Sequence, residues 1–180
     1  FIGLSEVGPE TIRRAAAVHP IADLQIEYSL ISRGIESSIL PTCRALGIGL
    51  TAYGVLSRGL ISGPWQAGAQ AGRGDFRASI PRFQGENLEK NLALVEEIKR
   101  IAHARGATVA QVAIAWALSR GDDIVPLIGA RRRDRLAESL GALALTLDRE
   151  ELSALENLAS SVSGARYAQA QMAHLDSEGR

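Results

Sequence analysis

The sequence predicts an α/β fold with a parallel sheet whose strands are joined by helical crossovers. Four short apolar runs of strand length are separated by stretches in which apolar residues recur at helical spacing. Such an alternation favours a parallel sheet, because parallel strands need a crossover connection, and it fits either an open doubly wound sheet or part of a barrel. No G-x-G-x-x-G motif follows the first strand, although an open dinucleotide-binding sheet usually carries one.

Length and composition fit one globular domain. The 180 residues are 46% hydrophobic and 22% charged, and 20 basic residues balance 20 acidic ones. A net charge of zero gives no global field toward nucleic acid or anionic membranes, and no apolar run approaches the roughly 18 residues of a membrane span. The single cysteine, Cys43, rules out an intramolecular disulfide. We expect a soluble cytoplasmic protein without nucleic-acid or membrane partners.

The first three strands are predicted by apolar runs that end at turn residues. An apolar run at residues 1–4 precedes a helix that carries Ile12 and Ala15 on one face, and Pro20 ends that helix. The second strand is predicted at residues 24–30, and a second helix spans about 35–46. Gly47 can stop this helix, so residues 48–53 are predicted as a third, buried strand.

The second half of the chain predicts one further strand and most of the helices. An irregular stretch from 57 to 85 carries Trp65, Phe76 and Phe83, which either line a substrate pocket or anchor the loop. Amphipathic spacing predicts a long helix at 86–105, and Thr108 caps the next helix. The fourth strand is predicted at 123–128, and the remaining predicted helices lie at about 132–142, 148–160 and 168–173.

An arginine-rich segment stands where the fourth strand passes into a helix. Residues 129–135 read Gly-Ala-Arg-Arg-Arg-Asp-Arg, and cations at a helix amino terminus oppose the positive end of the helix dipole. A bound anion reverses that effect, and guanidinium groups with free backbone N–H groups suit a terminal phosphate. The alternative is a solvated basic surface with Asp134 and Glu138 as local partners.

A second candidate is the turn that follows the third strand, residues 53–59. Its backbone amides and Arg58 could approach a diphosphate while Tyr53 stacks on a planar ring. The alternative is a core tyrosine followed by an ordinary turn. Ser5 and Gln25 are polar residues near the ends of otherwise apolar strands, where each is either a ligand or a hydrogen-bonded structural group.

The sequence shows no pattern for metal binding, thiol catalysis or a serine nucleophile. His19, His103 and His174 lack metal-ligand spacing and do not pair with Cys43, so we predict neither a metal site nor thiol catalysis. The serines at 5 and 57 lack the context of a nucleophile elbow.

Several segments, taken in order, resemble one known family. They are Gly3-Leu4-Ser5-Glu6, Gln25-Ile26-Glu27-Tyr28-Ser29-Leu30, Gly47-Ile48-Gly49, Ala52-Tyr53-Gly54-Val55-Leu56-Ser57-Arg58-Gly59, Pro81-Arg82-Phe83, Glu86-Asn87, Ala115-Trp116 and the stretch 126–140. Together they resemble the aldo-keto reductases, in particular the bacterial branch that includes pyridoxal reductase-like enzymes.

This resemblance implies the C-terminal half of a (β/α)8 TIM barrel, with strands five to eight present and the N-terminal half absent. The absence of an initiator before Phe1, with Met172 as the only methionine, agrees with a truncated chain. The site of such a barrel lies at the carboxyl ends of the strands. By this resemblance, we expect residues 1–180 to form the C-terminal half of one oxidoreductase domain.

The resemblance also implies the ligands of NADP(H). Ser5 and Gln25 are expected to hold the nicotinamide carboxamide, and Tyr53 to stack on the nicotinamide ring. The residues expected along the diphosphate are Gly54, Val55, Leu56, Ser57, Arg58 and Gly59. The residues expected around the 2′-phosphate and the adenine are Gly129, Ala130, Arg131, Arg135, Glu138 and Ser139. Three positions depart from the family pattern: Glu6 replaces asparagine, Ala130 replaces serine or threonine, and Ser139 replaces asparagine.

The expected catalytic groups lie outside this chain. In the family a tyrosine, assisted by lysine, aspartate and histidine, protonates the carbonyl oxygen, and all four belong to the first half of the barrel. We therefore assign no catalytic role to Tyr28, Tyr53 or Tyr167. The full-length protein is expected to reduce an aldehyde or ketone with NADPH, and this chain alone is expected to be inactive. The alternative is a non-catalytic nucleotide-binding or regulatory module, and a half barrel with open edges and an apolar interior is expected to self-associate.

Overall fold

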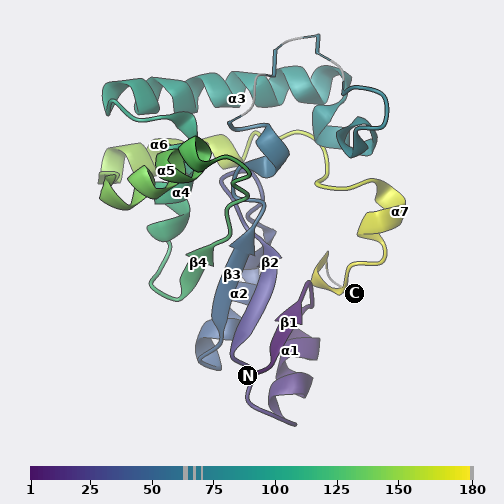
Figure 1. Ribbon diagram of the computed structural model, residues 1–180. Helices are drawn as coiled ribbons and strands as arrows, with labels where there is room; N and C mark the ends of the chain where they lie inside the picture. The colour runs from purple at the N-terminus through teal and green to yellow at the C-terminus, as the bar shows by residue number, and fades with distance from the viewer. Residues whose placement is uncertain (63–64, 67, 70, 179–180) are drawn as a thin grey trace.

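A parallel four-stranded sheet forms the centre of the part of the chain that the structure describes. The computed structural model describes residues 1–62, 65–66, 68–69 and 71–178. The strands are β1 (Gly3–Ser5), β2 (Asp23–Glu27), β3 (Gly49–Tyr53) and β4 (Ile124–Pro126). They lie side by side in the order β1-β2-β3-β4 (Figure 1). The predicted α/β class and the parallel sheet are confirmed.

The strand order decides between the two windings that the sequence left open. A doubly wound sheet reverses its strand order at a switch point. Among the described strands every strand instead pairs with the one before it in the chain, so the winding runs in one direction throughout. The described strands therefore contain no switch point, and their winding is that expected of a barrel segment.

The helices follow the predicted positions to within a few residues, with one exception. The described helices are α1 (Pro9–Ala16), α2 (Ile39–Ala45), α3 (Gly85–Ala104), α4 (Val109–Leu118), α5 (Arg133–Leu140), α6 (Arg149–Ala159) and α7 (Gln169–Met172). The predicted helix at 35–46 is divided, because a short 3-10 turn at Gly34–Ser37 is separated from α2 by Ser38 at φ −148°. Gly47 and Gly106 follow their helices at φ 66° and φ 59°, in the left-handed region that glycine adopts without strain.

The two faces of the sheet differ in what covers them. One face carries Leu24, Ile26, Leu50 and Ala52, which are buried in the core together with residues of α1, α2 and α4. The opposite face carries Ser5 and Gln25, which are exposed. This face was expected to be apolar. That expectation is wrong for β1 to β3, because these strands place polar side chains such as Ser5 and Gln25 on it. Among the described strands, β4 is the one that exposes an apolar residue there, Val125.

The irregular stretch between β3 and α3 is tied down by its own aromatic residues. The rings of Trp65 and Phe83 lie 4.9 Å apart, and the Arg77 guanidinium lies 4.9 Å from the Trp65 ring. Phe76 is exposed. For Trp65 and Phe83 this geometry favours the anchoring role over a role in lining a substrate pocket.

The chain after α6 returns to the sheet. Residues 164–178, which we call the C-terminal strap, pass through α7 and reach the carboxyl end of β1 (Figure 1). The backbone N–H of Gly8 donates to Asp176 Oδ2 at 2.7 Å, which fixes the end of the strap beside α1. None of the described helices combines the length and the apolar character needed to cross a membrane.

Candidate functional site

A cleft lies between the turn after β3 and the end of β4, where two of the predicted site segments meet. Its volume is about 430 Å³. The lining residues are Tyr53, Gly54, Val55, Leu56, Arg58, Gly59, Ser62, Leu127, Ile128 and Gly129. The structure thus brings most of the 53–59 turn together with Gly129, at the carboxyl edge of the sheet.

The backbone of the 53–59 turn is shaped for close approach to a ligand. Gly54, Ser57, Arg58 and Gly59 all have positive φ, and the two non-glycine residues carry strain of about 1 to 2 kcal/mol each. Within the described residues, the N–H groups of Val55 and Leu56 find no acceptor. Adjacent free N–H groups in such a turn form a concavity that binds anions.

Two glycines and a serine hold this turn in place. A Cβ on Gly54 would lie 3.1 Å from Glu27 Cγ, so the position needs glycine for space as well as for its φ of 69°. Ser57 is buried, and its hydroxyl lies 3.2 Å from Ser29 Oγ. The Ser57 side chain therefore supports the turn from inside, and only its backbone is available to a ligand.

Arg58 lines the cleft, but its charge is already compensated. Its Nη2 donates to Glu27 Oε2 at 2.8 Å, and its guanidinium carbon lies 4.5 Å from the centre of the Tyr167 ring. An anion in the cleft consequently meets the backbone amides of the turn more directly than a free guanidinium.

Ser5 and Gln25 lie beside each other at the open face of the sheet. They are register partners in the β1–β2 pair, and both are exposed. Tyr53 ends β3, and its hydroxyl donates to Glu6 Oε1 at 2.8 Å. Burial, then the hydrogen bonds to Tyr167 and Glu6, raise the pKa of Tyr53.

Glu6, which follows Ser5 in the chain, is held by several hydrogen bonds. It adopts φ 52°, and its carboxylate accepts the Glu27 N–H at 2.9 Å, Arg166 Nη2 at 2.6 Å and Ser177 Oγ at 2.8 Å. Burial opposes the charged form, but the hydrogen bonds, first among them those from Arg166, outweigh burial and lower its pKa to about 2. Glu6 is therefore a saturated anion, whereas the neighbouring Ser5 is exposed.

The arginine-rich segment is exposed at the start of α5. Arg132 is the N-cap residue and pairs with Asp134 at 2.6 Å, and Arg135 pairs with Glu138 at 2.7 Å. No ion pair is recorded for Arg131 among the described residues. The predicted partners Asp134 and Glu138 are thus in place, and surface pairs of this kind contribute at most about 1 kcal/mol, so a ligand phosphate can displace them.

Among the described residues expected around the 2′-phosphate and the adenine, only Gly129 lines the 430 Å³ cleft. Ser139 donates to the Arg135 carbonyl at 2.9 Å, and Ala130 is half-buried. Glu138 lines a further cavity of about 460 Å³ whose wall includes Thr108 and Ser62. Ser62 is the one residue that lines both this cavity and the 430 Å³ cleft among the described residues.

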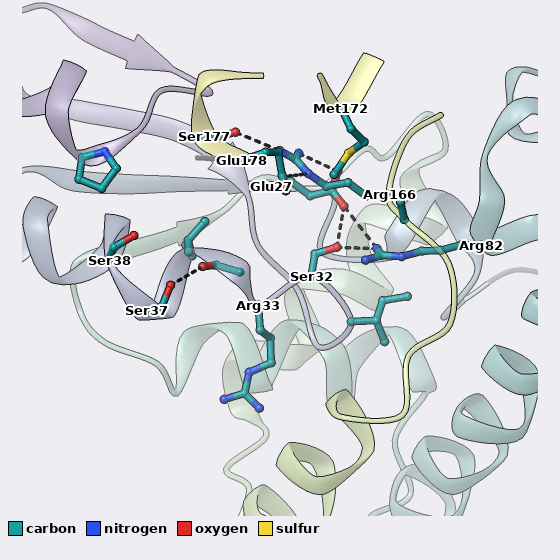
Figure 2. A pocket seen from close by; sticks show the side chains of 15 residues that line it. Glu27, Ser32, Arg33, Ser37, Ser38, Arg82, Arg166, Met172, Ser177 and Glu178 are labelled. Carbon is teal, nitrogen blue, oxygen red and sulfur yellow. Dashed lines mark hydrogen bonds and ion pairs between the residues drawn. The ribbon is translucent and has the colours of Figure 1, made fainter. Parts of the chain in front are cut away.

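A buried cluster of charged residues beside the site was not predicted from the sequence. The fully buried carboxylate of Glu27 accepts Ser32 Oγ at 2.7 Å and lies 3.7 Å from Arg82 Nη1 and 3.5 Å from Arg166 Nη1. Figure 2 shows Glu27, Ser32, Arg82 and Arg166 converging at a cavity of about 420 Å³. The sequence signal that could have revealed this cluster is Glu27, an acidic residue inside the predicted strand at 24–30.

The environments of Tyr28 and Tyr53 do not suit proton donation. Burial and the hydrogen bond from the Tyr28 hydroxyl to Glu36 Oε1 at 2.6 Å raise the pKa of Tyr28, and the pKa of Tyr53 is raised as well. A general acid works best with a pKa near the working pH. The described residues also contain no cluster of three histidine, cysteine or acidic side chains placed to hold a metal ion.

Comparison with known proteins places these features in one family. The model of the Aldo/keto reductase family matches residues 1–160. A Glycine max protein described as "Probable aldo-keto reductase 1" is 43% identical over 169 residues, covering 93% of this chain and 49% of that protein. A glycerol dehydrogenase of Gluconobacter oxydans superposes with a TM-score of 0.83 at 32% identity, over 91% of this chain and 50% of its own. A thermostable aldo-keto reductase in complex with the inhibitor epalrestat gives a TM-score of 0.64 at 25% identity, over 88% and 48%. The chain spans about half the length of these relatives.

Proposed function

The chain belongs to the aldo/keto reductase family, and from this premise we propose that it forms the nucleotide-binding, C-terminal half of an NADP(H)-dependent oxidoreductase. Its four strands are then strands five to eight of a (β/α)8 barrel. The whole protein reduces an aldehyde or ketone to an alcohol, and bound NADPH supplies the hydride.

The observation that carries this proposal is the 430 Å³ cleft at the carboxyl edge of the sheet. Barrel enzymes build their sites at that edge, and often bind phosphate after strands seven and eight. The 53–59 turn follows β3 and the 129–135 segment follows β4, so they occupy those two places in the proposed barrel. The fit is chemical as well, because the turn offers N–H groups that find no acceptor within the described residues, and the segment offers exposed guanidinium groups.

Each group of residues has a distinct role in this proposal. Ser5 and Gln25 hold the carboxamide at the open face of the sheet, and Tyr53 packs against the nicotinamide ring. The amides of the 53–59 turn bind the diphosphate. Arg131 and Arg135 bind the 2′-phosphate, with Gly129 and Ala130 beside them, and Glu138 and Ser139 lie near the adenine.

The binding test is a fluorescence titration of the chain with NADPH and with NADH. Replacing Arg131 and Arg135 by alanine removes two charge-assisted hydrogen-bond donors, so NADPH binding weakens by about tenfold or more while NADH binding changes little. The matched control is Arg100→Ala, which removes an exposed arginine that pairs with Glu97 on α3. Absence of NADPH binding to the unmodified chain contradicts the proposal, and equal weakening of both nucleotides contradicts the assignment of the arginines.

The catalytic part of the proposal is tested by complementation. The chain alone is expected not to reduce a carbonyl substrate, and a mixture with the N-terminal half of the Glycine max relative is expected to do so. The second candidate is a non-catalytic nucleotide-binding or regulatory module, which shares the nucleotide cleft but lacks the catalytic step. Retained NADPH binding with no reduction in a mixture that forms a 1:1 complex supports that candidate.

A further inference from the structure

The C-terminal strap is fastened to the sheet by one arginine. The Arg166 side chain is only 8% exposed, and its Nη1 and Nη2 donate to the two carboxylate oxygens of Glu6 at 3.1 and 2.6 Å. Its Nε donates to Glu178 at 2.7 Å, so the guanidinium also ties two points of the strap together. A two-pronged, largely buried ion pair of this kind has a defined geometry, unlike a single-contact surface pair.

The same ion pair holds the tip of Tyr53. The Tyr53 hydroxyl lies 2.8 Å from Glu6 Oε1, 3.2 Å from the Tyr167 hydroxyl and 3.3 Å from Arg166 Nη1. The Tyr53 hydroxyl is therefore surrounded by Glu6, by Arg166 and by Tyr167, the strap residue that follows Arg166. Tyr53 itself lines the nucleotide cleft.

The strap does not cover the polar face of the sheet on which a carboxamide is proposed to bind. Ser5 and Gln25 are both exposed, although Glu6 is the next residue in the chain after Ser5. Both side chains therefore stay accessible beside the strap. Its contacts instead concentrate on the hydroxyl of Tyr53 and on the carboxylate of Glu6.

We propose that Arg166 is a positioning residue for the nicotinamide end of the cofactor: it clamps Glu6, and through Glu6 and the strap it fixes the ring of Tyr53. Glu6, which stands where the family pattern has asparagine, is the anchor of the strap and not a carboxamide ligand. This inference rests on the proposed nucleotide-binding function. It adds a group that acts on one end of the cofactor and leaves the other end unaffected.

The ion pair between Glu6 and Arg166 stays charged over a wide pH range. The hydrogen bonds from Arg166 help to lower the pKa of Glu6 to about 2, although burial opposes this. Burial lowers the pKa of Arg166, but the bonds to Glu6 and the charge of Glu27 outweigh it and raise that pKa. Both partners stay charged from mild acid to alkaline pH, so the clamp does not open by titration near neutrality.

The test compares two ligands that differ in the nicotinamide end. NADPH carries the nicotinamide, whereas adenosine 2′,5′-bisphosphate carries only the adenosine and its phosphates. Dissociation constants are measured for both with the unmodified chain, Arg166→Ala, Arg166→Lys and the control Glu97→Gln, which removes a surface partner of Arg100 on α3. For Arg166→Ala we expect about tenfold weaker NADPH binding, or 1.4 kcal/mol, and less than twofold change for the bisphosphate.

If Arg166 positions Tyr53, Arg166→Lys restores part of the NADPH affinity because it returns a cation to Glu6, and Glu97→Gln leaves both dissociation constants within twofold. Equal weakening of both ligands by Arg166→Ala, or no weakening of either, overturns the inference. If Arg166→Ala does not fold by circular dichroism, Glu6→Gln makes the same comparison with a side chain of the same shape. Failure of the unmodified chain to bind either ligand overturns the proposed function itself, which separates the two failures.

Discussion

Replacing Glu27 by glutamine tests the charge cluster under the site. The substitution keeps the shape of a side chain that is 0% exposed and removes its negative charge. The side chains of Arg58 and Arg82 are 14% and 10% exposed, and Glu27 is the only ion-pair partner recorded for either of them among the described residues. Arg166 keeps Glu6 and Glu178 as partners.

The magnitude follows from leaving buried charges uncompensated. Removal of one partner of a buried ion pair costs about 3 to 5 kcal/mol, and the loss of the one acidic partner that Arg58 and Arg82 have among the described residues places Glu27→Gln in that range. For a chain of this length, each kcal/mol corresponds to roughly 2 to 4 °C in Tm, so the expected decrease is roughly 6 to 20 °C.

The assay is urea unfolding followed by circular dichroism at pH 7, with Glu97→Gln as the control. Glu97 pairs with Arg100 on the surface of α3, where both side chains are at least half exposed, so its replacement is expected to cost less than about 0.5 kcal/mol. An unfolding free energy for Glu27→Gln within about 1 kcal/mol of the unmodified chain refutes the reasoning.

Three other variants test neighbouring features. Since the pKa of Glu6 is lowered from 4.5 to about 2, its charge stabilises the fold above about pH 5, and the stability gap between the unmodified chain and Glu6→Gln should narrow as the pH falls from 5 to 2 in urea melts; a constant gap contradicts this. Gly54→Ala forces a Cβ against Glu27 at φ 69°, so it should cost about 1 to 3 kcal/mol and weaken NADPH binding in the same titration; unchanged stability and affinity contradict the close approach. Thr108→Ala removes a capping box with Gln111 and should lower the unfolding free energy by about 1 kcal/mol; no loss of stability would show that the cap contributes nothing.

Local signals predicted most of the helices and strands because their causes are local. Gly47 and Gly106 end helices since left-handed backbone favours glycine, and Thr108 begins one because its hydroxyl accepts a free N–H. The division of the predicted helix at 35–46 has a tertiary cause. Glu36 in the 3-10 turn is held by Tyr28 at 2.6 Å and by Arg33, which fixes this turn apart from α2.

The site was predictable only where one segment carries its own chemistry. The turn at 53–59 and the segment at 129–135 each contain their ligand groups, so sequence reasoning located them. The partnership of Glu6 with Arg166 joins residues 160 positions apart, and no periodicity or motif connects them. Glu27 gave a usable signal as an acid in an apolar strand, but its partners Arg58 and Arg82 come from the irregular stretch after β3.

Hydrogen exchange of the chain with and without NADP+ tests the central claim most directly. Binding in the proposed cleft slows exchange in peptides covering residues 53–59 and 129–135, where the turn amides and the start of α5 meet the phosphates. Peptides from α2, on the covered side of the sheet, serve as the internal reference and should not change. Protection of both segments supports the nucleotide-binding account. Unchanged exchange in both at saturating NADP+, or protection confined to other segments, contradicts it.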